Sequence, residues 1–75
     1  MIEKRPNYLA EGIALEKQGD LDAALTSYRL ALRYAPADAK VLLNMAIALT
    51  KANRTDEAIR TYRQVLDVEP RLDGA

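Results

Sequence analysis

Apolar residues recur along most of the chain at the spacing of amphipathic helices, and Gly, Asn and Pro interrupt them at regular intervals. Leu21, Leu25, Tyr28 and Leu32 follow one another in steps of three or four residues, which places them on one face of a helix. No alternating apolar and polar pattern of a strand stands out, and good helix formers such as Ala, Leu, Arg and Glu dominate. The pattern predicts four helices, near residues 6–17, 21–35, 39–52 and 55–68.

The third predicted helix differs from the others because it is apolar nearly all round. From Val41 to Leu49 only Asn44 is polar. A helix of this kind is covered on several sides. We therefore expect neighbours around this helix, and a single stripe of contacts along the second and fourth helices.

The four predicted helices fall into two copies that are 34 residues apart. The stretch GDLDAALTSYRLALRYAP begins at Gly19, and NRTDEAIRTYRQVLDVEP begins at Asn53. Helix–turn–helix units at a fixed period of 34 residues are the signature of a helical repeat array. The sequence predicts an all-α fold, an α-solenoid of two helix–turn–helix repeats with four antiparallel helices. We expect one domain over residues 1–75, with repeat one at about 5–38, repeat two at about 39–72 and no C-terminal capping helix.

On these positions the chain resembles the tetratricopeptide repeat family, whose pattern is W-x₂-L-G-x₂-Y, then A-x₃-F, then P. The first copy has Tyr8, Glu11, Gly12, Leu15, Ala24, Tyr28 and Pro36 at these positions, and the second has Leu42, Met45, Ala46, Leu49, Ala58, Tyr62 and Pro70. We expect the small residues at four of these positions to let paired helices approach closely, and both tyrosines to fill the volume between them. The prolines are expected to end the second helix of each copy.

The two ends of the predicted array differ from each other. Glu11 stands where the pattern has Leu, so either this face is the N-terminal end of the array or the side chain points partly outward. At the other end, Ile59, Leu66 and Val68 are expected to offer apolar surface. Because about three repeats are normally needed for stability, we expect one of two situations. The chain is a segment of a longer array, or these residues hold two copies together as a homodimer.

The resemblance also implies a concave groove, lined by the first helix of each repeat, that binds a protein partner. It places in the groove Pro6, Leu9, Ala10, Ile13, Glu16 and Lys17, and then Lys40, Leu43, Asn44, Ile47, Thr50 and Lys51. The residues expected to contact the partner are Leu9, Ile13, Lys17, Lys40, Leu43, Asn44, Ile47 and Lys51. An aliphatic floor with lysines suits an apolar peptide or an amphipathic helix that carries acidic groups. The alternative is that neighbouring helices or a second chain cover the aliphatic residues.

Composition argues against chemistry as the function. The chain has no Cys and no His, so Ser27, its only serine, has no partner for a catalytic triad, and we expect neither an enzyme nor a metal or cofactor site. Eleven basic and eleven acidic residues balance, which gives no long-range attraction to nucleic acid or to a membrane surface. The N-terminus has no apolar stretch typical of a signal peptide, so a cytoplasmic location is expected. The function expected is that of a non-enzymatic protein-interaction scaffold, with a self-associating structural unit as the alternative.

Overall fold

The computed structural model describes residues 7–69 and contains the four predicted helices. They are α1 (Tyr8–Lys17), α2 (Leu21–Tyr34), α3 (Ala39–Lys51) and α4 (Thr55–Val68). Every helix end lies within two residues of its predicted position, and residues 7–69 contain no strand. The parts assigned to Pro6 and Pro70 lie outside the described residues.

The residues between the helices adopt the backbone conformations and form the helix caps that the sequence predicts. Gly19 and Asn53, at the same place in the two repeats, have φ angles of 85° and 62°, in the left-handed region that these two residue types tolerate. Asp20 accepts a hydrogen bond from the backbone N–H of Ala23 at 3.2 Å, and Asp38 accepts one from that of Lys40 at 3.0 Å. These carboxylates satisfy N–H groups that have no partner within the helix. The residues of the turns themselves therefore account for where one helix ends and the next begins.

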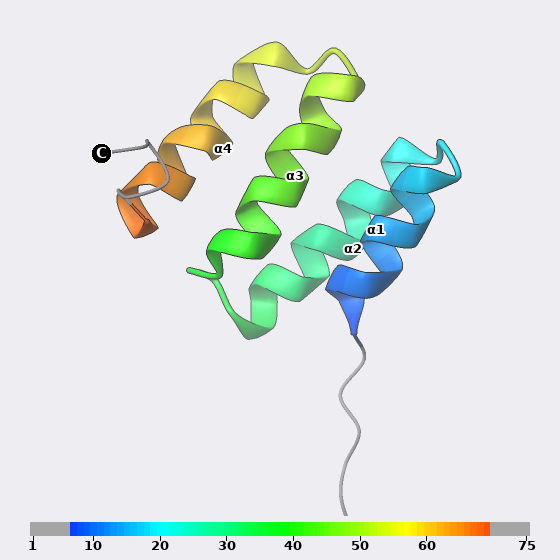
Figure 1. Ribbon diagram of the computed structural model, residues 1–75, viewed down its shortest axis with the longest axis horizontal. Helices are drawn as coiled ribbons and strands as arrows, with labels where there is room; N and C mark the ends of the chain where they lie inside the picture. The colour runs from blue at the N-terminus through cyan, green and yellow to red at the C-terminus, as the bar shows by residue number, and fades with distance from the viewer. Residues whose placement is uncertain (1–6, 70–75) are drawn as a thin grey trace, which may run out of the picture.

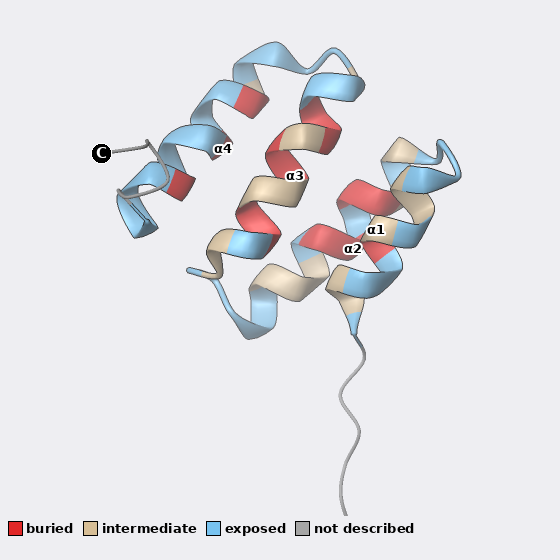
Figure 2. Cartoon of the chain, viewed as in Figure 1, coloured by how far each residue is buried: buried red, intermediate tan, exposed pale blue. Residues whose placement is uncertain are grey.

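The helices form two hairpins that pack side by side. Helix α1 packs on α2, α3 packs on α4, and α3 also packs on α2 (Figure 1). Helix α3 consequently lies between α2 and α4, and Figure 2 shows buried residues along much of its length. Its buried residues are Val41, Leu42, Met45, Ala46, Ala48 and Leu49. The prediction that this helix is covered on several sides is confirmed.

Within repeat one, helix packing depends on Gly12. A Cβ atom added at Gly12 would lie 2.5 Å from Cε1 of Tyr28, so only glycine leaves room for the ring. The Tyr28 ring is fully buried between the helices, as predicted. Glycine at this position thus lets α1 and α2 approach closely enough to enclose an aromatic side chain.

The corresponding expectation for Tyr62 is wrong. Ala58 is buried as predicted, but Tyr62 is 37% exposed and does not fill an interior volume. The reason is that, within residues 7–69, no helix packs on the outer side of α4. In Figure 2 the surface of α4 is accordingly exposed over most of its length.

Candidate functional site

Helices α1 and α3, which were expected to line a groove, are in contact near both of their ends. Near their N-terminal ends, Leu9 and Val41 line the same pocket. Near their C-terminal ends, Nζ of Lys51 lies 2.8 Å from Oε2 of Glu16. The two helices therefore run alongside each other in the same direction. This arrangement places the first helices of the two repeats side by side.

The four aliphatic residues of the predicted site are all half-buried. Leu9 and Ile13 pack against the core cluster that contains Tyr28 and Leu49. Leu43 lies beside α4, where it lines a second hollow. Each of these side chains thus combines a contact with the fold and a surface that remains open to solvent, and the residues of the two repeats do not have equivalent neighbours.

The polar residues of the predicted site differ in whether they form hydrogen bonds or ion pairs with other residues of the chain. Lys17 and Lys40 are exposed. Lys51 forms an ion pair with Glu16, and its side chain is half-exposed. Asn44 donates a hydrogen bond from Nδ2 to the backbone carbonyl of Lys40 at 2.8 Å. The charge available to a partner therefore comes mainly from Lys17 and Lys40.

The side chain of Glu16 connects α1 to both α2 and α3 through hydrogen bonds. The sequence pattern did not predict this connection. Oε1 of Glu16 accepts a hydrogen bond from the Tyr28 hydroxyl at 2.7 Å, while Oε2 accepts one from Nζ of Lys51 at 2.8 Å. Only 10% of the Glu16 side chain is exposed, and its bond to Tyr28 is partly buried, whereas its bond to Lys51 lies at the surface. Burial of the ring raises the pKa of Tyr28, and the hydrogen bond to Glu16 and its negative charge raise it further. We call this set of contacts the Glu16 bridge.

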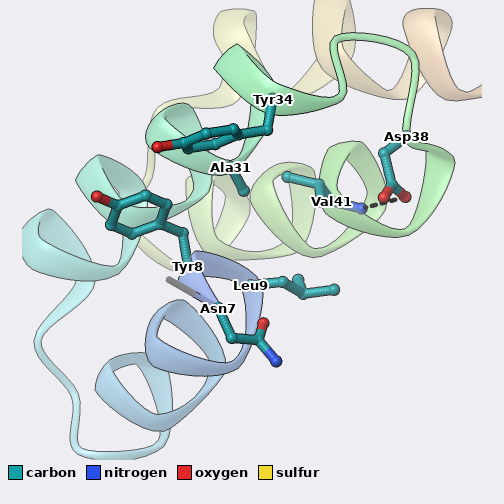
Figure 3. Close-up of a pocket in the computed structure, with 7 residues that line it drawn as sticks. All are labelled: Asn7, Tyr8, Leu9, Ala31, Tyr34, Asp38 and Val41. Carbon is teal, nitrogen blue, oxygen red and sulfur yellow. Dashed lines mark hydrogen bonds between the residues drawn. The ribbon is translucent and has the colours of Figure 1, made fainter. Parts of the chain in front are cut away.

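A pocket of about 360 Å³ lies where the N-terminal ends of α1 and α3 meet the C-terminal end of α2 (Figure 3). Its lining residues are Asn7, Tyr8, Leu9, Ala31, Tyr34, Asp38 and Val41. The rings of Tyr8 and Tyr34 stack with centroids 6.0 Å apart, and Figure 3 shows both on one side of the pocket. Asn7 and Asp38 use their side-chain oxygens to cap α1 and α3.

Among these lining residues, only Leu9 belonged to the predicted partner-binding set. The others were missed because they come from three helix ends that are far apart in sequence. One signal was present, since Tyr8 stands at the aromatic position of the repeat pattern. Nothing in the sequence indicated that Tyr34 would stack on it.

A second hollow, of about 290 Å³, opens between α3 and α4. It is lined by Leu43, Tyr62, Val65 and Leu66. Three exposed apolar side chains share one face of α4 at this hollow, namely Ile59, Tyr62 and Leu66, and we call them the α4 patch. Val68 is also exposed, but on the opposite face of the helix. The three residues predicted for self-association are thus exposed, but only Ile59 and Leu66 share a face, and Tyr62 adds an aromatic ring to it.

The paired helices of the structure agree with the family to which sequence similarity assigns the chain. A family model described as the tetratricopeptide repeat matches residues 15–73, and the chain belongs to this family. It is also similar to the TPR repeat-containing protein MJ1428 of Methanocaldococcus jannaschii, with 36% identity over 61 residues. The match covers 81% of this chain but only 11% of that relative, so the chain spans about a tenth of its length. Repeats of this family are generally protein-interaction modules and are generally not enzymes.

None of the helices in residues 7–69 is long and apolar enough to cross a membrane. Nor does this part of the chain bring together three or more His, Cys, Asp or Glu side chains that could hold a metal ion.

Proposed function

We propose that the chain is a non-enzymatic protein-interaction module that binds a peptide or an amphipathic helix along the face formed by α1 and α3. The observation that supports this proposal best is the parallel course of these two helices, with half-buried Leu9, Ile13, Leu43 and Ile47. Aliphatic side chains that are only partly covered can still gain contacts when a partner binds. Ser27 is buried and has no His or Cys anywhere in the chain to activate it, which favours binding over catalysis.

The exposed lysines favour a partner that carries acidic groups. Lys17 and Lys40 lie near opposite ends of the proposed face, and within residues 7–69 neither forms an ion pair. Carboxylates of a bound peptide could pair with either lysine. Lys51 is a weaker candidate because a partner would compete with Glu16 for its ammonium group. Exposed charges act mainly on the association rate and on specificity, and salt screens them.

This function can be tested with a peptide ligand, obtained by selecting from a random displayed library those peptides that bind the immobilised protein. We expect Ile47→Glu to abolish binding of the selected peptide, measured by fluorescence anisotropy, with little change in helicity measured by circular dichroism. The matched control is Ile59→Glu, which places the same charge on α4, and it should leave binding intact. If Ile47→Glu unfolds the protein, then Lys17→Glu together with Lys40→Glu provides the test, and these changes should weaken binding of an acidic peptide. Equal binding by the wild type and all these variants would refute the proposal.

A second candidate function is self-association through the α4 patch. Of the five large apolar side chains that are markedly exposed in residues 7–69, four lie on this one helix, and three of them, Ile59, Tyr62 and Leu66, share one face of it. An apolar surface concentrated in this way marks an interaction site more often than scattered apolar residues do. The two expected occupants are the next repeat of a longer array and a second copy of the chain.

A further inference from the structure

We propose that the pocket lined by Tyr8, Tyr34 and Asp38, which we call the tyrosine pocket, holds an arginine side chain of the bound partner. This inference rests on the proposed function, because Leu9 lines the pocket and also belongs to the proposed face of α1 and α3. It adds the class of residue that the partner presents at the N-terminal ends of these two helices.

The size and the walls of the tyrosine pocket suit a single long side chain. Its volume of about 360 Å³ lies at the lower end of the range of ligand pockets, which is about 300–1,000 Å³. Leu9, Ala31 and Val41 provide apolar walls. An arginine side chain has an apolar stem and a planar, charged end with five N–H donors. Its stem can therefore contact the apolar walls while its guanidinium group meets an aromatic ring and a carboxylate.

Two aromatic rings form one side of the pocket. Tyr8 and Tyr34 stack with their centroids 6.0 Å apart and an angle of 25° between their planes. Tyr34 is 55% exposed, the highest value among the large apolar side chains of residues 7–69. The corresponding residues of repeat two are Leu42 and Val68, so the repeat does not require a ring at both positions. Exposed tyrosine rings offer a surface on which a guanidinium group stacks favourably.

Asp38 supplies a negative charge, and Figure 3 shows it across the pocket from the two rings. Its Oδ1 accepts hydrogen bonds from the backbone N–H groups of Lys40 and Val41, at 3.0 and 3.4 Å, whereas Oδ2 accepts none within residues 7–69. Capping a helix does not require the charge, since Asn caps equally well and Asn7 does so for α1. Oδ2 therefore remains available to the N–H donors of an arginine.

Other charges of residues 7–69 do not cancel that of Asp38. The N-terminal ends of α1 and α3 and the C-terminal end of α2 meet here, and their half-charges sum to about +0.5, against −1 for the carboxylate. Arg33 lies one helical turn beyond Arg29, on the side of α2 where Arg29 pairs with Glu57 of α4. Lys40 is exposed and forms no ion pair with Asp38. The pocket therefore favours a cationic group over an anionic one.

Peptides selected from a random displayed library on the immobilised protein test this inference. We expect the binding peptides to share an arginine at one position. Replacing it by citrulline, which has nearly the same shape but no charge, should weaken binding about tenfold, measured by fluorescence anisotropy. Peptides that bind without an arginine, or equally well with citrulline, would overturn this inference and leave the proposed function standing. A selection that yields no binding peptide would overturn both.

Asp38→Asn shows whether the arginine lies in the tyrosine pocket. This variant keeps a capping side chain and removes the charge, so helicity should be unchanged while the arginine peptide binds about tenfold more weakly. Citrulline and arginine peptides should then bind this variant alike. The matched control is Asp20→Asn, which makes the same change at the cap of α2 and should leave binding intact. Equal affinity of the arginine peptide for the wild type and Asp38→Asn would overturn the inference.

Tyr34→Leu tests the contribution of the rings. It keeps an apolar side chain but removes one aromatic face, and it should weaken binding of the arginine peptide about threefold. The matched control is Tyr62→Leu, which removes an exposed ring from α4 and should leave binding intact. Unchanged binding by Tyr34→Leu would overturn the assigned role of the rings.

Discussion

Tyr28 and Tyr62 occupy the same place in the two repeats but have different surroundings. Tyr28 is fully buried and donates a hydrogen bond to Glu16, whereas Tyr62 is 37% exposed. The residue that corresponds to Glu16 in repeat two is Thr50, whose hydroxyl donates to the backbone carbonyl of Ala46. Equal sequence positions therefore do not give equal burial. The difference lies in the neighbour, because α3 covers α2 and, within residues 7–69, no helix covers α4 on the equivalent side.

The small residues that face the partner helix of the same repeat behave alike in both copies. Ala24 and Ala58 are both buried, and so are Ser27 and Thr61. Each repeat thus buries these small residues in the same way. The tyrosine position differs also within the repeat, because Gly12 and Glu16 of α1 contact Tyr28, whereas repeat two has Ala46 and Thr50 at the corresponding positions. Both kinds of difference matter in a repeat array, in which stability is a sum of terms within repeats and terms between neighbours.

Truncation of Tyr28 and Tyr62 should show the difference in burial between the two repeats most strongly. Removing a large buried ring leaves a cavity, so Tyr28→Ala should lower the free energy of unfolding by about 3–5 kcal/mol. Tyr62→Ala should lower it by no more than about 1 kcal/mol, because its ring is already partly hydrated. Urea denaturation followed by circular dichroism, at protein concentrations low enough to keep the chain monomeric, measures both values. Similar losses for the two variants would mean that α4 is covered in solution.

Substitution of Gly12 and Ala46, the small residues where the two helices of each repeat approach closely, should have the next largest effect on stability. Gly12→Ala brings a Cβ to 2.5 Å from the Tyr28 ring, and we expect a loss of about 1–3 kcal/mol from overpacking. Ala46 stands at the same position of repeat two, and Ala46→Gly should lower stability by about 1 kcal/mol through helix propensity. Thermal denaturation ranks the two variants. A Gly12→Ala variant that is more stable than the wild type would show that the crossing of α1 and α2 can widen freely.

High pH should weaken repeat one selectively. Because the pKa of Tyr28 is raised in the folded state, the neutral hydroxyl is favoured by folding. Its contribution is complete below the pKa of an unfolded tyrosine, which is about 10, and falls as the pH rises above that value. Tyr28→Phe has no hydroxyl to ionise and should therefore lose less stability than the wild type between neutral and strongly alkaline pH. Tyr62→Phe is the control, and equal pH dependence of all three proteins would contradict the assignment.

The smallest expected effect concerns the two lysines that end α1 and α3. Lys51→Ala removes an ion pair with Glu16 and should lower the free energy of unfolding by about 0.2–1 kcal/mol, less at high salt. Lys17 holds the same position in repeat one but forms no ion pair within residues 7–69, and Lys17→Ala should change stability less. Denaturation of both variants at low and high salt measures the difference. A larger loss for Lys17→Ala would contradict the importance of the Glu16 bridge.

Most of the fold could be predicted from the sequence because local chemistry specifies it. Gly19 and Asn53 adopt the backbone conformation expected of them, and Asp20 and Asp38 cap the helices that follow. The resemblance to the repeat family then supplied the pairing of the helices. The exposure of Tyr62 could not be predicted from its own surroundings in sequence, since it depends on whether another helix lies beyond it.

The candidate site was less predictable for a similar reason. Helical spacing placed Leu9 and Ile13 on one face, as it did Leu43 and Ile47, but it did not show that Leu43 would lie beside α4. The contact of Glu16 with Lys51 joins residues that are 35 positions apart, so it depends on how the two repeats dock. Side chains whose partners lie in another repeat are the ones that sequence periodicity describes least well.

The Glu16 bridge has a consequence for folding kinetics. Each helix hairpin closes over a short turn, and such local contacts form rapidly. The bond between Glu16 and Lys51 can form only after both hairpins are present and docked. If docking follows the transition state, loss of this bond accelerates unfolding and leaves the folding rate unchanged. The bond between Lys51 and Glu16 would then form late in folding, and it would prolong the lifetime of the docked repeats by at most a few-fold without changing how quickly they dock.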